Sequence, residues 1–200
     1  MAMSLSRATK PGAFVRRRGL ELRLRSTALM WSAMALTILA LAHAGALGVP
    51  LFLLAVYLGV RGHRQHGLSK RWLAGARAER AVGRALRALA GEGCVVMHDI
   101  DTGRGNVDHL VAYEDVTFAV ETKYRRFEPS HLDQARRGAR RMAHDYHRPC
   151  HAVICLAYGP SLLEQEDGVW IVSRDRVVGL VRWLERRGRT PLGSPETLRA

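Results

Sequence analysis

The sequence predicts an α/β domain preceded by an N-terminal membrane segment. Residues 27–60 contain no Asp, Glu, Lys or Arg and a single His, which is typical of a segment placed in lipid. From Lys70 onward, helical spacing of apolar residues alternates with short β-branched runs of strand length. The expected order is helix, three strands, helix, strand, and then one more strand and helix.

The basic charge of the chain is divided between its two ends. The 31 Lys and Arg residues exceed the 18 Asp and Glu residues, which gives a net charge of +13. Residues 1–26 hold seven basic residues and one acid, and residues 61–200 hold 24 basic residues and 17 acids. We interpret residues 1–26 as a basic disordered arm that contacts anionic lipid headgroups, with contact to nucleic acid as the alternative.

Residues 27–60 are predicted to form two transmembrane helices. One straight helix over this run would be about 51 Å long, whereas the hydrocarbon core of a bilayer is about 30 Å thick. Glycines and Pro50 interrupt the run near its middle, so two helices over about residues 27–42 and 47–60 fit better. Basic residues flank both ends, and the positive-inside rule then places both ends in the cytoplasm.

A cleavable secretory signal that ends near Ala44 is the alternative for this segment. Cleavage there would leave a mature chain that begins with a second apolar run. The three cysteines, Cys94, Cys150 and Cys155, are odd in number and lack the spacing of a disulfide framework, which favours reduced thiols in the cytoplasm. We therefore expect a multi-pass protein of the cell membrane, with both termini and the folded domain cytoplasmic.

The rest of the chain is divided into a linker over residues 61–69, a folded domain over residues 70–188 and a tail over residues 189–200. The domain is expected to open with a helix over about residues 70–90, whose apolar stripe runs from Trp72 to Leu89. Glu79 lies on that stripe. Its carboxylate therefore faces the sheet and needs either a cation or a neighbouring guanidinium.

A strand over residues 94–100 and a turn over residues 101–105 come next. We interpret the turn as an ordinary hairpin loop, with contact between a phosphate and Gly103, Arg104 and Gly105 as the alternative.

A predicted hairpin then concentrates polar side chains on one face of the sheet. Two strand-length runs are joined by Glu114 and Asp115, and a two-residue loop there places Asp108 directly opposite Glu121. Alternation along the second strand places Lys123 on the same face. Two close carboxylates repel each other and burial adds a desolvation cost, so a divalent cation such as Mg²⁺ would resolve the conflict. A surface hairpin with a simple Glu/Lys pair is the alternative.

A second helix is expected over about residues 131–144, with Gln134 beside its buried stripe. Few acids balance the arginines on and before this helix. We therefore interpret these arginines as a surface for nucleic-acid phosphates, with a solvated charged face as the alternative. The set consists of Arg125, Arg126, Arg136, Arg137, Arg140 and Arg141.

The last elements are strands over residues 151–157 and 169–172 and a helix that ends at Gly188. Four potential zinc ligands precede or open the first of these strands, but their spacing matches no recognised ligand pattern, so zinc is a minor alternative. They are His144, His147, Cys150 and His151.

Taken together, these motifs resemble the nuclease-related domain family of the restriction-endonuclease-like superfamily, which is named for its PD-(D/E)-x-K signature. The residues that carry the resemblance are Ala78-Glu79, Gly105-Asn106-Val107-Asp108-His109, Glu121-Thr122-Lys123 and Gln134, within about residues 78–157. Val107 replaces the proline of the signature. The resemblance implies a restriction-endonuclease-like core of αβββαβ order, with a mixed sheet flanked by helices.

The resemblance also implies a function, a magnesium-dependent nuclease, and together with the two apolar helices it gives a membrane-anchored nuclease at the cytoplasmic face. Asp108 and Glu121 would be Mg²⁺ ligands, with the backbone carbonyl of Thr122 as a third. Lys123 would orient the attacking water or stabilise charge on the phosphate. Glu79 and Gln134 would complete and support the site.

The expected partners are the membrane and nucleic acid, with DNA put first, although nothing in the sequence separates DNA from RNA. A non-catalytic, membrane-tethered nucleic-acid-binding or scaffold module is the rival interpretation. The oligomeric state is left open.

Overall fold

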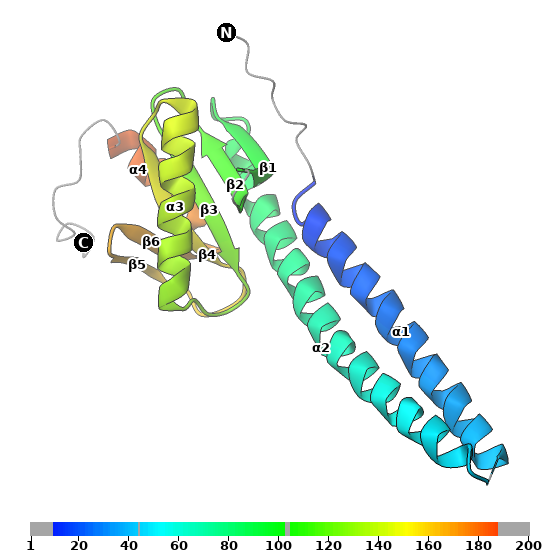
Figure 1. Ribbon diagram of the computed structural model, residues 1–200. Helices are drawn as coiled ribbons and strands as arrows, with labels where there is room; N and C mark the ends of the chain where they lie inside the picture. Colours follow the sequence, from blue (N-terminus) through cyan, green and yellow to red (C-terminus); the bar gives the residue numbers. More distant parts are fainter. Residues whose placement is uncertain (1–9, 44, 103–104, 188–200) are drawn as a thin grey trace. The chain divides into compact units, whose positions relative to one another are not determined.

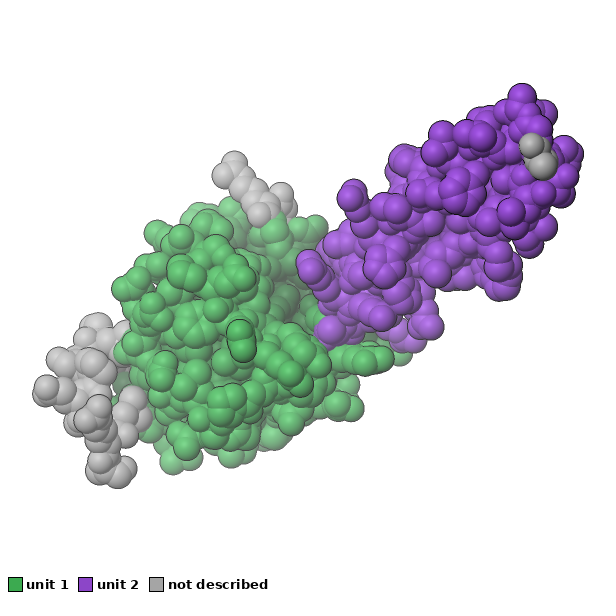
Figure 2. Space-filling model, turned by 90° about the horizontal axis from the view of Figure 1, so that it is seen from below, with its two compact units in different colours: residues 1–13, 75–200 green, residues 14–74 purple. Residues whose placement is uncertain are grey.

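The computed structural model describes residues 10–43, 45–102 and 105–187 (Figure 1). The chain divides into two compact units, residues 14–74 and residues 75–187 together with the segment before residue 14 (Figure 2). The elements, in chain order, are α1 (Ala13–Ala42), α2 (Gly48–Leu86), a 3-10 helix η1 (Arg87–Leu89), β1 (Val95–Asp101), β2 (Asn106–Ala112), β3 (Thr117–Lys123), α3 (Pro129–Tyr146), β4 (Cys150–Leu156), β5 (Leu163–Glu166), β6 (Val169–Ser173) and α4 (Val177–Arg187).

Within the unit of residues 14–74, α1 packs antiparallel against the first part of α2 along small residues. A Cβ on Gly19 would lie 3.0 Å from the Leu73 side chain, and a Cβ on Gly62 would lie 3.1 Å from Met30 Cγ. The buried Ser69 hydroxyl donates to the Gly19 carbonyl at 2.8 Å. Small residues thus let the two helix backbones approach closely, as in packed membrane helices.

This pairing corrects three of the sequence predictions. Residues 13–26 of the expected disordered arm are helical, residues 61–69 of the expected linker lie inside α2, and Trp72 is partly exposed rather than in the domain core. The cause is tertiary: α1 and α2 support each other, which the local sequence does not reveal. Residues 1–9 of the arm and the tail over residues 189–200 lie outside the described residues.

The membrane prediction is met for one helix. Among the described residues, only α1 is long and apolar enough to cross a membrane, by length and composition, a test that a signal sequence also passes. The expected break near Pro50 is present as the turn between α1 and α2. However, α2 is a single helix of 39 residues that continues into charged sequence. The expected pair of short transmembrane helices is therefore replaced by one apolar helix of spanning length.

The second unit contains a mixed sheet of six strands in the order β1-β2-β3-β4-β6-β5. The pairs β1–β2, β2–β3 and β5–β6 are antiparallel, whereas β3–β4 and β4–β6 are parallel. This confirms the predicted mixed α/β fold with a sheet flanked by helices. The short edge strand β5 was missed because its sequence, Leu-Glu-Gln-Glu, has no β-branched or aromatic residue.

Each face of the sheet has its own apolar core. On one face, α3 covers a core that includes Leu110, Ala119 and Ile154. On the other face, the end of α2, η1 and α4 cover a core that includes Phe118 and Val153 (Figure 1). Because side chains alternate along a strand, β3 sends its odd-numbered residues toward α3 and its even-numbered apolar residues toward the second core.

Candidate active site

The β2–β3 hairpin has the register that the sequence predicts. Ala112 pairs with Thr117 and His109 pairs with Val120, and the Tyr113 N–H donates to the Val116 carbonyl at 2.9 Å to close the two-residue turn. The same alignment predicted Asp108 opposite Glu121. The regular ladder, however, stops at His109.

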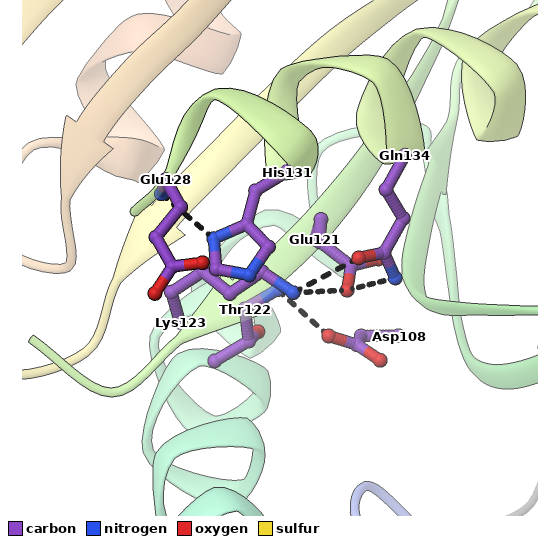
Figure 3. A network of polar contacts seen from close by, with 7 residues as sticks. All are labelled: Asp108, Glu121, Thr122, Lys123, Glu128, His131 and Gln134. Atoms are coloured by element: carbon purple, nitrogen blue, oxygen red, sulfur yellow. Dashed lines mark hydrogen bonds and ion pairs between the residues drawn. The ribbon is translucent and has the colours of Figure 1, made fainter. Parts of the chain in front are cut away.

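Beyond His109, the carboxylate of Asp108 takes the place of a backbone acceptor for β3. Asp108 Oδ2 accepts a hydrogen bond from the Thr122 N–H at 2.7 Å (Figure 3). The hairpin therefore brings Asp108 to the backbone beside Glu121.

Glu121, Lys123 and Gln134 form one hydrogen-bonded triangle (Figure 3). The Lys123 ammonium donates to Glu121 Oε1 at 2.9 Å and to Gln134 Oε1 at 3.1 Å, and Gln134 Nε2 donates to the same Glu121 oxygen at 2.6 Å. Glu121 is only 7% exposed. Strand β3 supplies the first two residues at alternate positions on one face, and α3 supplies the third from above that face.

Among the described residues, carboxylates outnumber cations around this triangle. Burial, followed by the charges of Glu121 and Glu79, raises the pKa of Asp108 well above its usual range. Burial also raises the pKa of Glu121, although Lys123 opposes that change. A single ammonium thus faces several carboxyl groups, and the ionised form of the site is electrostatically unfavourable as it stands.

Glu79 joins this group from α2. Its side chain is 6% exposed, and its Oε2 has no hydrogen-bond partner among the described residues. Burial, then Asp99 and Glu121, raise its pKa to about 8. The sequence left a guanidinium partner open as an alternative, but the ion pairs of the described residues include none with Glu79, so the buried oxygen stays available to a cation.

Sequence reasoning did not single out Asp99. This residue has a left-handed backbone with φ of 52°, and it interrupts the β1–β2 ladder between two regular pairs. Its carboxylate accepts from the Ala13 N–H at 3.1 Å and from Asn106 Nδ2 at 3.3 Å. The available signal was an aspartate in the middle of a strand, a residue type that strands disfavour.

The segment before α1 lies against Glu79. Pro11 and Gly12 are buried, and Gly12 has a left-handed φ of 70°. A Cβ at this glycine would lie 2.9 Å from the Ala76 carbonyl oxygen and 3.3 Å from Glu79 Oε2. This part of the expected disordered arm therefore forms a wall of the candidate site.

His109 of the resemblance motif lies behind the carboxylates. It is fully buried, and its Nδ1 is 2.8 Å from Nδ1 of His98 on the paired strand, so one ring donates and the other accepts. Burial and the neighbouring His98 lower the pKa of His109 to about 3. The pair is therefore neutral at physiological pH and acts as a structural link between β1 and β2.

His131, at the start of α3, also lies at the site. Its Nδ1 accepts from the Glu128 N–H at 2.9 Å, and burial followed by the Lys123 charge lowers its pKa (Figure 3). The sequence gave no signal for this residue beyond its place at the helix start.

The donors present suit magnesium in kind. Among the described residues, no three His, Cys, Asp or Glu side chains are arranged to hold a metal ion as they stand. Magnesium, however, needs only one or two protein carboxylates and keeps several waters. Asp108, Glu121 and the orphaned Glu79 oxygen offer such donors. Thr122 is buried beside them, and its Oγ1 has no hydrogen-bond partner among the described residues.

The predicted basic residues do not all lie together. Arg137, Arg140 and Arg141 line one cavity beside Gln134. Arg136 instead pairs with Asp133 at 3.1 Å and with Asp167 at 3.7 Å. The other two predicted arginines, Arg125 and Arg126, are exposed in the connection between β3 and α3. The phosphate alternative for Gly103 and Arg104 falls outside the described residues.

Comparison with known proteins gives one family. Neither the curated proteins nor the solved structures gave a match to this chain. The family model described as "Nuclease-related domain" matches residues 74–157. That span includes Glu79, β1 to β3 with Asp108 and the Glu-x-Lys strand, α3 with Gln134, and β4. Residues 74–157 are therefore a nuclease-related domain of the restriction-endonuclease-like superfamily, as the sequence motifs indicated.

Proposed function

We propose that this protein is a membrane-anchored, magnesium-dependent nuclease that hydrolyses phosphodiester bonds of nucleic acid at the cytoplasmic face. The observation that carries the proposal is the triangle of Glu121, Lys123 and Gln134 beside the carboxylate of Asp108. The Lys123 ammonium is held by two acceptors beside carboxylates that it does not balance. A module that only binds nucleic acid has no need of such an arrangement.

In this proposal each residue of the network has a separate role. Gln134 fixes the Glu121 carboxylate and the Lys123 ammonium, so that neither reorganises when substrate binds. Lys123 donates two hydrogen bonds within the protein and has a third proton, with which it can orient a water molecule or contact a phosphate oxygen. The Thr122 N–H holds Asp108 in place.

Magnesium would be held by Asp108 and Glu121, with the Thr122 carbonyl as a third ligand and Glu79 completing or adjusting the site. When bound, it supplies Lewis-acid activation of the phosphodiester and neutralises the negative charge that builds up during hydrolysis. The carboxylates that are unfavourable without a cation are then stabilised by it.

The proposed substrate is nucleic acid, with DNA as the first choice. The family of the domain suggests nucleic-acid binding, and Arg137, Arg140 and Arg141 of α3, with the exposed Arg125 and Arg126 before it, would supply the phosphate contacts. Sequence-independent binding is expected, because phosphates carry no base information.

The proposed location is the cell membrane, with the nuclease-related domain in the cytoplasm. Supporting this, α1 is of spanning length, and large apolar side chains on α1 and on the start of α2 are exposed, including Trp31, Ile38, Phe52 and Leu53. The exposed apolar side chains at the start of α2 extend the apolar surface that α1 presents. The basic residues before and after the apolar region then favour the cytoplasm for both ends.

A nuclease assay on the full chain in detergent tests the proposal. The wild type should cut single-stranded and duplex DNA and RNA substrates to measurable extents with Mg²⁺, and EDTA should stop cleavage. Lys123→Ala and Asp108→Ala should each lower the rate at least about 100-fold, because each removes a group positioned at the reacting phosphate.

The matched control is Glu164→Gln on β5, an exposed carboxylate of the same sheet, which should cut like the wild type. Cleavage that survives in both site variants would come from a contaminant or another site. Magnesium binding and nucleic-acid binding without any cleavage would favour the rival, a tethered non-catalytic module with a nuclease fold.

A further inference from the structure

A groove runs from the candidate active site along α3. Its volume is about 510 Å³, and one end is lined by Gln134, the α3 residue of the hydrogen-bonded triangle. One wall is α3, and the other is formed by Thr102, which follows β1, and by the start of β2 at Asn106 and Val107. The helix and β2 approach closely because residue 138 is glycine: a Cβ there would lie 3.3 Å from Val107 Cγ2.

The groove carries unbalanced positive charge. Arg137, Arg140, Arg141 and His144 line it on successive turns of α3. Arg141 pairs with Asp145 at 3.0 Å, but among the described residues no Asp or Glu pairs with Arg137 or Arg140. Like charges one turn apart on a helix repel each other, so an anion in the groove relieves a cost that the free protein bears.

The neighbouring Arg136 shows that only some arginines of α3 line the groove. It does not line the groove, and Asp133 of α3 and Asp167 of the β5–β6 turn both lie within ion-pair distance of its guanidinium. Adjacent arginines of one helix therefore differ in their surroundings: Arg136 is already paired, whereas Arg137 has no acidic partner in the part of the chain that the structure describes. The charge that faces the groove comes from one side of α3, the side that leads to Gln134.

We propose that this groove binds the sugar–phosphate backbone of a single nucleic-acid strand next to the bond that is cleaved. The inference rests on the proposed function and names the form of its substrate. Cβ atoms of Arg137 and Arg141 are about 5–6 Å apart, as for any i, i+4 pair, so the two guanidiniums can contact successive phosphates.

The size of the groove selects one strand. A volume of about 510 Å³ is that of an ordinary small-molecule pocket. A pocket of this size accommodates a nucleotide or two of one strand, whereas the paired partner strand of a duplex would have to stay outside it. Single strands, flaps and frayed ends should therefore bind better than blunt duplex DNA.

Binding of labelled oligonucleotides to the full chain in detergent, with EDTA present, tests this inference without any cleavage. A single-stranded 12-mer should bind at least about fivefold more tightly than a blunt duplex of the same sequence. Arg137→Gln should weaken single-strand binding about five- to tenfold. It should also reduce the slope of log K against log salt by about 0.7, because one neutralised phosphate contributes that much to the slope on a single strand.

The matched control is Arg136→Gln, which makes the same charge change one position away and should leave the dissociation constant within about twofold. Arg137→Lys keeps the charge and should recover part of the affinity. Equal losses in Arg136→Gln and Arg137→Gln, tighter duplex binding, or no loss at all would each overturn the inference. If the wild type cuts DNA but Arg137→Gln binds normally, the groove inference is wrong and the proposed function still holds. If Arg137→Gln selectively loses binding but the wild type never cuts, the groove binds a single strand and the proposed function is wrong.

Discussion

The two ends of the β2–β3 hairpin are built from the same two strands but in opposite ways. At the turn, Val111 and Phe118 are opposed and fully buried, and the backbone ladder is regular. At the other end, the ladder stops at His109, and Asp108 uses its carboxylate to hold the backbone of Thr122. The turn end has the buried apolar side chains and the regular pairing that strands favour, whereas the open end places charged groups where burial disfavours them.

The turn end of the hairpin therefore contributes to stability, whereas the open end holds the groups of the candidate site. Apolar burial at the turn end supplies free energy of folding. The open end uses part of that free energy to hold Glu79, Asp108 and Glu121 near one another, and burial raises the pKa of all three carboxyl groups. Sites that break local rules in this way are typically functional.

The largest expected effect lies at the turn end. Phe118→Ala should lower the free energy of unfolding by about 3–5 kcal/mol, because the ring is fully buried and its removal leaves a cavity. Chemical denaturation followed through the buried Trp170 would measure the loss. Protein that remains folded should still bind Mg²⁺. Loss of Mg²⁺ binding in the folded fraction would show that the two ends are not separable.

The second effect is a dependence of stability on pH at the open end. The pKa of Glu79 rises from 4.5 to about 8 on folding, so the folded state holds its proton more tightly than the unfolded state. Its contribution to stability is full below pH 4.5 and is lost as the pH rises to about 8, which amounts to about 2–4 kcal/mol. Added Mg²⁺ should restore stability at pH 8, because it binds the ionised carboxylates of the folded state.

Glu79→Gln is the variant that isolates this effect. Its unfolding free energy should change less than that of the wild type between pH 4.5 and pH 8, and the exposed control Glu164→Gln should follow the wild type. A wild type whose stability does not fall across this window would mean that Glu79 is not held protonated, and the contrast between the two ends would then be weaker than described.

A smaller gain is expected from removing one charge at the open end. In Asp108→Asn, the side-chain amide oxygen can still accept a hydrogen bond from the Thr122 N–H, but the charge repulsion with Glu79 and Glu121 disappears. The variant should therefore be about 1–2 kcal/mol more stable than the wild type at pH 8 without metal. Mg²⁺ should stabilise it less than it stabilises the wild type. A destabilised Asn variant would indicate that Asp108 is already neutralised by a partner.

The sequence predicted the regular parts of this hairpin and missed the contacts made at long range. The register followed from a two-residue turn and side-chain alternation, both local properties. Asp99 was missed because its partner, the Ala13 N–H, lies 86 positions away in the chain. In the same way, the arginine-rich start of α1 reads as disordered until α2 is placed against it, and that pairing depends on distant glycines.

The smallest expected effect tests the segment that covers the open end. Gly12→Ala should lower the unfolding free energy by about 1–2 kcal/mol, because φ is 70° and the new Cβ would meet the Ala76 carbonyl and approach Glu79. Gly93→Ala is the matched control, since φ there is 75° but nothing lies within 4 Å of the added Cβ. The backbone cost is common to both variants, so any excess loss in Gly12→Ala measures packing on the site.

The excess should be accompanied by faster exchange of the Ala13 amide hydrogen, which is otherwise protected by Asp99. Release of this segment should also expose Glu79 to water and bring its pKa closer to the ordinary value. The pH range over which Gly12→Ala loses stability should therefore be narrower than that of the wild type. Equal losses at positions 12 and 93, with an unchanged pH window, would mean that the N-terminal segment lies near the carboxylates without helping to desolvate them.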